Sequence, residues 1–507
     1  MMNRFFALVC ISLLSMSISA QTNEYEEFKK QQMKNFALFS SDQQAKYDAY
    51  RRELNEQYAQ FMEDSWIKLS ALPAVEIHEE QTVHPMVYEM DKEPKFELSE
   101  EKIDSVASSD AILDFIPILL KKEVIKIPTP TPQPEPIAPI QAKVIPHDLV
   151  SVAFYGTLVS IPFPINEEWS ISHVNEKYLA KVWKELSTSA YDMTIRGVLD
   201  LRESFQLCDW GYMQMLQAVC EKKYGKSNEA VFMQSYLMAQ SGYKIRLASS
   251  NERLYMLVAS DYNILSMFYF IVDAEKFYPI NCATRELAVC KAAFDTEKKI
   301  SLQIAKEQNL DADIVEPRKL TSKYGISVDV ERNQNLMDFY SDYPSSYIDG
   351  NIYTRWAVYA NTPLDSSIAA SLYPDLRSSI AGLNERDAVN KLLNFVQTAF
   401  EYEYDDKVWG GDRAFFAEET LYYPYADCED RAVLFSRIVR DIMGLNVVLL
   451  YYPGHLAAAV EFNEDVNGDY LIYDNIKYIV CDPTYIGAPV GRTMPNMNNQ
   501  EAQIILL

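Results

Sequence analysis

Alternating prolines in the segment IPTPTPQPEPIAP, residues 127–139, set the strongest limit on what this chain can fold into. Proline has no backbone N–H and its ring clashes with the preceding helical turn, so the segment cannot form a helix interior or a central strand. This composition is typical of a stiff, extended spacer of the polyproline type. The sequence therefore predicts a division here, with the first compact domain beginning after the spacer, near Asp148.

The composition on either side of the spacer indicates how the rest of the chain is organised. Residues 23–66 are charged and Gln-rich, with aromatic side chains at helical spacings, which predicts helices with a surface for packing or for a protein partner. We expect an α+β protein with a signal peptide (1–20), a helical segment (21–66), a Pro-rich linker (67–147), a first domain (148–310), a β-rich connection (311–383) and a C-terminal domain (384–507).

The N-terminus and the charge restrict location and partners. Arg4, the apolar run behind it and the small residues up to Ala20 have the layout of a secretory signal peptide. No later stretch has about 18 consecutive apolar residues, so we expect no membrane span. The net charge of −25 excludes nucleic acid as a partner, because few cations are present to neutralise phosphates. The expected protein is exported, to the periplasm or the cell exterior.

One of the cysteines has an unusual setting. The chain has seven, Cys10 lies in the expected signal peptide, and no pair has the CxxC spacing of a metal site. Most are expected to be buried free thiols, although an even number in an exported protein also permits disulfides. Cys428 instead lies among acidic residues in YADCEDRA, where Asp427 is the expected N-cap of a helix that ends at Gly444. A thiol in the first helical turn is favoured as thiolate by the helix dipole, but its acidic neighbours oppose ionisation, so it needs an imidazolium partner.

A histidine and an aspartate follow at positions that suit such a partner. His455 is one of five histidines in the chain, and the alternation in GHLAAAVEF places it on the strand face opposite Leu456. Downstream, Asn467-Gly468 predicts a hairpin, and a strand ends at Asp482. An antiparallel neighbour of this kind can bring the carboxylate to the far nitrogen of the His455 ring. Each residue also has a purely structural interpretation. Cys428 can be a helix-cap thiol, His455 a core histidine and Asp482 a turn former.

The order Cys, His, Asp on helix, strand and next strand resembles that of papain-like and transglutaminase-like cysteine enzymes. The stretches DCEDRA, GHLAAAV and CDPTY, within residues 384–507, are similar to the three motifs of the transglutaminase-like superfamily. The acidic DCED version is similar to that of the bacterial transglutaminase-like cysteine proteinases. The resemblance implies Cys428 as nucleophile, His455 as general base and acid, and Asp482 as orienting carboxylate. It also implies a residue near the oxyanion, for which Tyr425 and Trp409 are candidates.

An internal repeat relates the C-terminal domain to the first one. An offset of about 202 residues sets SNEAVFMQSYLMAQSGYKIRLASSNERLYMLV against EDRAVLFSRIVRDIMGLNVVLLYYPGHLAAAV, each a helix, a glycine stop and two strands. Chance similarity is the alternative explanation. At the three candidate catalytic positions the first domain carries Lys226, Arg253 and Asn281, which cannot replace nucleophile, base and anion. If the repeat is real, the first domain is a catalytically inactive copy that serves as scaffold, binding platform or interaction module.

Together these features predict an exported cysteine peptidase or amidase that forms a thioester with a protein or peptide substrate and needs no cofactor or metal. Protein crosslinking by transamidation is one alternative. A non-catalytic binding module of an envelope or surface assembly is another.

Overall fold

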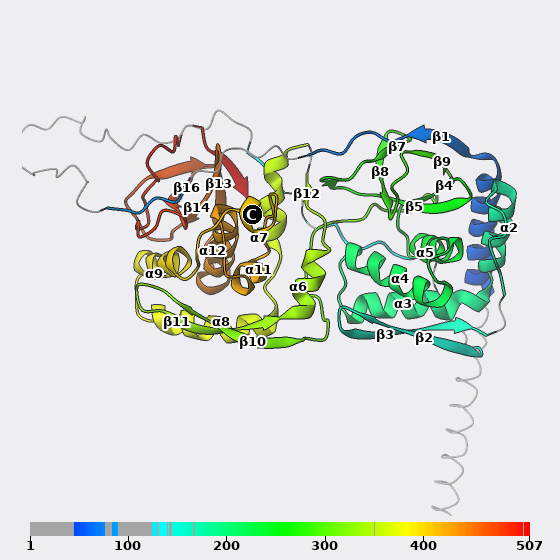
Figure 1. Ribbon diagram of the computed structural model, residues 1–507, viewed down its shortest axis with the longest axis horizontal. Helices are drawn as coiled ribbons and strands as arrows, with labels where there is room; N and C mark the ends of the chain where they lie inside the picture. The colour runs from blue at the N-terminus through cyan, green and yellow to red at the C-terminus, as the bar shows by residue number, and fades with distance from the viewer. Residues whose placement is uncertain are drawn as a thin grey trace, which may run out of the picture.

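The computed structural model describes the chain in segments: residues 45–76, 84–89, 124–127, 129, 131–138, 140, 144–165, 168–348, 350–499 and 501–507. The expected signal peptide lies outside them. The class is α+β, as predicted, with one six-stranded antiparallel sheet and one curled five-stranded antiparallel sheet (Figure 1). We call residues 45–76 together with 144–310 the first unit, and residues 311–507 the second unit. Among the described helices, none is long and apolar enough to cross a membrane.

The first unit has a sheet, a layer of helices and a hairpin, in that order (Figure 1). Its sheet has the order β1-β9-β4-β5-β8-β7, and β1 also contacts β7, so the sheet nearly closes into a barrel. Its elements are a helix over residues 45–64, β1 (Trp66–Ser70), β2 (His147–Phe154), β3 (Thr157–Pro164), α2 (Glu176–Leu186), η2 (Ser189–Tyr191), α3 (Asp192–Ser204), α4 (Asp209–Tyr224), α5 (Asn228–Gln240), β4 (Ile245–Ser250), β5 (Arg253–Ala259), β6 (Asn263–Ile264), β7 (Phe270–Val272), β8 (Glu275–Ile280) and β9 (Glu286–Cys290).

The second unit is arranged in the same three layers, with hairpin β10–β11 on the far side of the helices from the sheet (Figure 1). Its sheet has the order β15-β16-β14-β13-β17. Its elements are β10 (Ile314–Thr321), β11 (Ser327–Asn333), α6 (Gln334–Ser341), β12 (Ser346–Tyr347), η3 (Ile352–Thr354), α7 (Arg355–Asn361), α8 (Ser366–Ile380), α9 (Glu385–Thr398), α10 (Asp405–Val408), α11 (Ala417–Tyr422), α12 (Cys428–Met443), β13 (Val447–Tyr452), β14 (His455–Glu461), β15 (Tyr470–Tyr473), β16 (Ile476–Cys481) and β17 (Gln503–Leu506).

The two sheets share strand order and register. Read from the hairpin edge, β7-β8-β5-β4-β9 corresponds to β15-β16-β14-β13-β17. Ser250 pairs with Arg253 in the first unit as Tyr452 pairs with His455 in the second. One helix packs on the two central strands of each sheet, α5 in the first unit and α12 in the second. Residues that the 202-residue offset aligns in the sequence therefore occupy corresponding places in the two sheets.

Side chains and one short sheet connect the units. Strand β6 of the first unit pairs with β12 of the second. Tyr155 donates a hydrogen bond of 2.9 Å to Asp342 Oδ2, and Trp210 donates from its indole nitrogen to the Asp342 carbonyl at 3.3 Å. One hydrophobic core runs through both units, because the largest buried cluster contains residues of α5 as well as of α12. The second unit is therefore attached to the first by side-chain packing and hydrogen bonds as well as by the covalent chain.

The prediction that compact structure begins near Asp148 is wrong. Residues 45–64 and β1 already belong to the first unit, since β1 forms the edge of its sheet beside β9. Arg51 lies 2.5 Å from Asp192 in a buried ion pair. Tyr58 stacks on Trp183 with ring centroids 4.5 Å apart. The described part of the helical segment thus uses its apolar side to complete the first unit's core.

The Pro-rich segment forms no helix or strand in its described residues, as expected, but it is not a free spacer. It lies along the first unit, where Ile137 is buried and its N–H donates to the Gln240 carbonyl at 3.2 Å. Gln133 donates to Asp209 Oδ1 at 3.1 Å. Proline removes backbone donors but leaves carbonyls and apolar rings that can pack. The prediction that this segment is a spacer dividing the chain is therefore wrong.

Residues 311–383 are not β-rich. The region contains one hairpin and the short strand β12, but the helices α6, α7 and α8 make up more of it. The N-caps Asn333 and Asp365, which begin α6 and α8, are local signals for these helices.

Candidate active site

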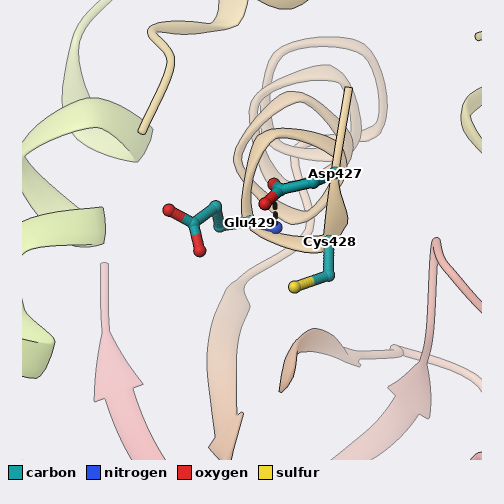
Figure 2. Close-up of side chains that lie close together, drawn as sticks. All are labelled: Asp427, Cys428 and Glu429. Atoms are coloured by element: carbon teal, nitrogen blue, oxygen red, sulfur yellow. Dashed lines mark hydrogen bonds between the residues drawn. The ribbon is translucent and has the colours of Figure 1, made fainter. Parts of the chain in front are cut away.

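Cys428 is the first residue of α12, and a capping box fixes the start of this helix. The Asp427 carboxylate accepts from the backbone N–H of Glu429 at 3.1 Å, and Asp430 reaches back to the N–H of Asp427 at 3.2 Å. Figure 2 shows Asp427 folded onto the first turn, with the Cys428 thiol and the Glu429 carboxylate projecting from it. The helix ends at Met443, and Gly444 adopts the left-handed conformation with φ 68°. The predicted N-cap and C-terminus are both confirmed.

Buried Arg431 ties this turn to the preceding loops. Its guanidinium donates to the carbonyls of Gln397 and Phe400 at 3.1 and 3.0 Å, and its Nε donates to the carbonyl of Ala426 at 3.3 Å. It also lies over the ring of Tyr402, 5.3 Å from the centroid. A buried charge is stable only when its donors are satisfied, and here carbonyl oxygens of three residues accept from it. The position of Cys428 is therefore set by a rigid helix start.

His455 and Asp482 are brought together by neighbouring antiparallel strands. His455 begins β14, Asp482 directly follows β16, and His455 Nε2 lies 2.8 Å from Asp482 Oδ2. The other carboxylate oxygen accepts the backbone N–H groups of Thr484 and Tyr485 at 2.9 and 3.2 Å. The Gln397 side chain donates to the Asp482 carbonyl at 3.0 Å. These bonds fix the carboxylate, so it holds one orientation of the imidazole.

The strand connection differs from the predicted one. The turn between adjacent strands is Asp474-Asn475, with φ of 49° and 63°, whereas Asn467-Gly468 lies in the longer connection from β14 to β15. A Cβ on Gly468 would lie 2.4 Å from the Gly491 Cα, so this glycine serves a close approach of two backbones. β16 is nevertheless the antiparallel neighbour of β14, as the position of Asp482 required.

The thiol and the imidazole lie close in the fold but share no hydrogen bond. The backbone N–H of Leu456, the residue after His455, lies near enough to the Cys428 thiol to lower its pKa, against the larger effect of burial. His455 Nδ1 is buried and has no hydrogen-bond partner. The structure therefore contains no hydrogen bond between Cys428 and His455. Cys428, His455 and Asp482 are each only 2% exposed.

Burial determines the protonation of the acidic groups around the thiol. Burial, followed by the charges of Asp427 and Glu429, raises the pKa of the Cys428 thiol well above its ordinary value. Burial also raises the pKa values of Asp427, Glu429 and Asp430 well above theirs. It raises the pKa of Asp405 to about 8, with the Glu429 charge as the next cause. The resting thiol is therefore neutral and needs a base to ionise it.

The effect of burial on carboxyl pKa values can be tested at Glu418, which is not one of the residues around the thiol. Burial raises its pKa to about 8, from an ordinary 4.5, despite a 2.8 Å hydrogen bond from the N–H of Asp365. Between these pH values the folded protein binds more protons than the unfolded chain, so stability falls as pH rises. We expect Glu418→Gln to raise the melting temperature at pH 8.5 and to change it little at pH 4, as measured by circular dichroism. Glu419→Gln is the control, because it breaks the 2.6 Å ion pair with Arg413 and should destabilise the protein at pH 8.5. A Glu418→Gln variant that loses stability at pH 8.5 would contradict the expected titration.

Neither of the two oxyanion candidates, Trp409 and Tyr425, forms a hydrogen bond to the thiol in the described part of the chain. Trp409 packs against Phe415 and Tyr423 and lines a cavity of about 390 Å³. Tyr425 is 37% exposed. Tyr402, which the sequence did not single out, has a buried hydroxyl without a hydrogen-bond partner. Burial, then the charges of Cys428 and Asp427, raises the pKa of Tyr402, and its ring lies against Arg431 in the same first turn of α12 as Cys428. No local pattern in EYEYDD marks Tyr402.

A segment from the expected linker lies beside the site. The Tyr88 N–H donates to the Ile486 carbonyl at 2.9 Å, and the Ile486 N–H donates to the Met86 carbonyl at 2.8 Å. His84 Nδ1 is hydrogen-bonded to the Tyr404 hydroxyl. Residues 84–89 therefore run along the backbone that follows Asp482, and this part of the linker contacts the second unit.

Two groups of side chains near α12 have the proximity that a metal ion needs. Ligand atoms of Asp427, Cys428 and Glu429 lie within 4.8 Å of one another, as do those of Asp405, Asp412 and Glu429. The second group already has a cation, since Arg355 lies 3.1 Å from Asp412 and 3.8 Å from Glu429. The expectation of a mechanism without metal or cofactor stays a prediction.

Two comparisons with known proteins give no relative for this chain. No protein-family model matches the chain, and a search of curated proteins finds no match.

Proposed function

We propose that the second unit is a cysteine hydrolase of the transglutaminase-like type, acting on an amide bond of a peptide or protein in an exported setting. The observation that carries the proposal is the buried His455–Asp482 pair at 2.8 Å, with His455 Nδ1 left without a partner in the same fold region as a helix-start thiol. An unsatisfied buried nitrogen costs free energy, so a functional partner explains its retention.

The reaction follows from these groups. His455 Nδ1 takes the proton of Cys428, and the sulfur attacks the carbonyl carbon of the substrate. The imidazolium, stabilised by Asp482, then gives its proton to the leaving amine, and a thioester remains on Cys428. Water attacks the thioester with His455 again as base, releasing the acid and the free thiol. The unpartnered Tyr402 hydroxyl is the donor we propose for the oxyanion, in place of Tyr425 and Trp409.

The matching topologies support a further part of this proposal. We infer that the first unit is a second copy of the same fold in which Lys226, Arg253 and Asn281 stand where the second unit has its candidate catalytic residues. The shared strand order and register are the support. None of these three side chains supplies a nucleophile and a base together, so the first unit contributes no chemistry of this kind.

An electrophilic peptide probe tests the proposal. A peptidyl vinyl sulfone should label Cys428, and the labelling should disappear in Cys428→Ala and His455→Ala. Cys282→Ala is the control, because Cys282 is the one described cysteine that is only half-buried. Labelling that instead depends on Cys282, or that persists in His455→Ala, would contradict an activated thiol.

One observation favours a non-catalytic binding module as the second candidate. The Cys428 thiol is buried, has a raised pKa and lacks a hydrogen bond to His455. Incubation with a peptide library, with and without a free amine, separates the functions. Shortened peptides indicate hydrolysis, amine adducts indicate transamidation, and unchanged peptides indicate the binding module.

A further inference from the structure

The first unit has a cavity at the place that corresponds to the candidate active site. The cavity has a volume of about 560 Å³, and Lys226, Arg253 and Asn281 all line it. Arg253 begins β5 as His455 begins β14, and Asn281 follows β8 as Asp482 follows β16. The N-terminus of α5, in the place of the α12 N-terminus, also lines the cavity. Volumes of about 300–1,000 Å³ are typical of ligand sites.

The two corresponding places differ in access. In the second unit, Cys428, His455 and Asp482 are buried. In the first unit, Lys226, Arg253 and Asn281 are exposed. The first unit therefore retains an open hollow where the second has a closed site.

Two cations and one amide side chain in this cavity have no protein partner among the described residues. Within the described part of the chain, no ion pair or hydrogen bond involves the side chain of Lys226, Arg253 or Asn281. The nearby carboxylates have donors: Glu229 accepts the N–H of Ile171 at 2.8 Å, and Glu252 accepts the N–H of Val174 at 3.3 Å. The positive end of the α5 dipole adds to the potential of the two free cations. Two cations and three carboxylates line the hollow, so it favours a ligand that brings a carboxylate to each unpaired cation over anions in general.

The lining also limits what kind of anion fits. The carboxylates Glu221, Glu229 and Glu252 border the same cavity, so a dense polyanion is repelled. A ligand with separated carboxylates can reach Lys226 and Arg253 while its amides meet Asn281. An acidic peptide segment has this chemistry, because each Asp or Glu side chain is separated from the next by backbone amides.

We propose that this cavity is a binding site for acidic peptide segments, with Lys226 and Arg253 pairing the carboxylates and Asn281 hydrogen-bonding the peptide backbone. The site does not depend on Cys428, so its test is independent of the proposed hydrolase activity.

Binding is measured by fluorescence anisotropy on the full chain carrying Cys428→Ala, which prevents turnover. Three labelled peptides of equal length are compared: one rich in Glu and Asp, one with Gln and Asn in their place, and one rich in Lys. We expect the acidic peptide to bind best and to weaken with added salt. Arg253→Glu and Lys226→Glu should each weaken it by about tenfold or more, as expected for loss of a close charge pair, whereas Arg253→Lys should retain most of the affinity.

Lys222→Glu is the matched control, since Lys222 is exposed on α4, does not line the cavity and changes the net charge equally. Equal weakening by Lys222→Glu would overturn the proposal in favour of a general charge effect. Equal binding of the neutral peptide would overturn the role of the cations. Displacement of the acidic peptide by low concentrations of inorganic phosphate would show a simple anion site and overturn the peptide assignment.

Discussion

Cys428→Ala is expected to lower the rate of peptide hydrolysis by about 10⁴-fold or more, because no other group in the proposed mechanism can form the thioester. The side chain is small and lies at the start of α12, where the Asp427 and Asp430 cap does not involve the sulfur. The helix should therefore remain intact. The measurement is the steady-state rate on a cleavable peptide, with circular dichroism to confirm the fold.

Cys481→Ala is the matched control for this substitution. Cys481 is a buried core thiol directly before Asp482, so its loss tests whether removing any thiol near the site is enough to stop the reaction. We expect activity within a few-fold of the original. Cys428→Ala protein that keeps its activity to within about tenfold would contradict the nucleophile assignment.

Asp482→Asn is expected to reduce kcat by about 10²–10⁴-fold with little change in KM. The Asn oxygen can still accept from Thr484 and Tyr485, so its amide NH₂ must face His455 Nε2. That contact forces the imidazole proton onto Nδ1. The ring can then no longer take the thiol proton, although its position is unchanged.

The pH dependence of the same variant separates orientation from folding. The lost rate should not return at any pH between 5 and 9, because the defect is the tautomer. Asp469→Asn is the control, since the Asp469 carboxylate accepts the N–H of Thr493 at 2.9 Å in the same unit but does not contact His455. An Asp482→Asn enzyme with normal kcat would show that the carboxylate has only a structural role.

Local patterns in the sequence were sufficient for the elements that carry the candidate site. The N-cap at Asp427 and the stop at Gly444 are the two ends of one helix. The alternation in β14 correctly separated Leu456 and Ala458 from Ala457 and Ala459, which belong to two different buried clusters. These features depend on neighbours in the chain, so periodicity and capping rules detect them.

Features that depend on distant residues were not predictable in this way. Trp66–Ser70 was assigned to a helix end and a linker, because its partner strand, Glu286–Cys290, is far along the chain. Tyr402 was missed since its place near Cys428 results from how Arg431 holds the intervening loop. The packing of the Pro-rich segment on the first unit likewise depends on surfaces that form only after folding.

The pairing of early and late segments also has a consequence for the order of synthesis. β1 can pair only after β9 has been synthesised. Ile125 donates a backbone hydrogen bond to Ile504 and accepts one from Leu506, at the far end of the chain. Loop closure over such separations is slow, and a chain made from its N-terminus cannot form these pairs until their late partners emerge. Each of these early segments therefore stays unpaired until its late partner has been synthesised.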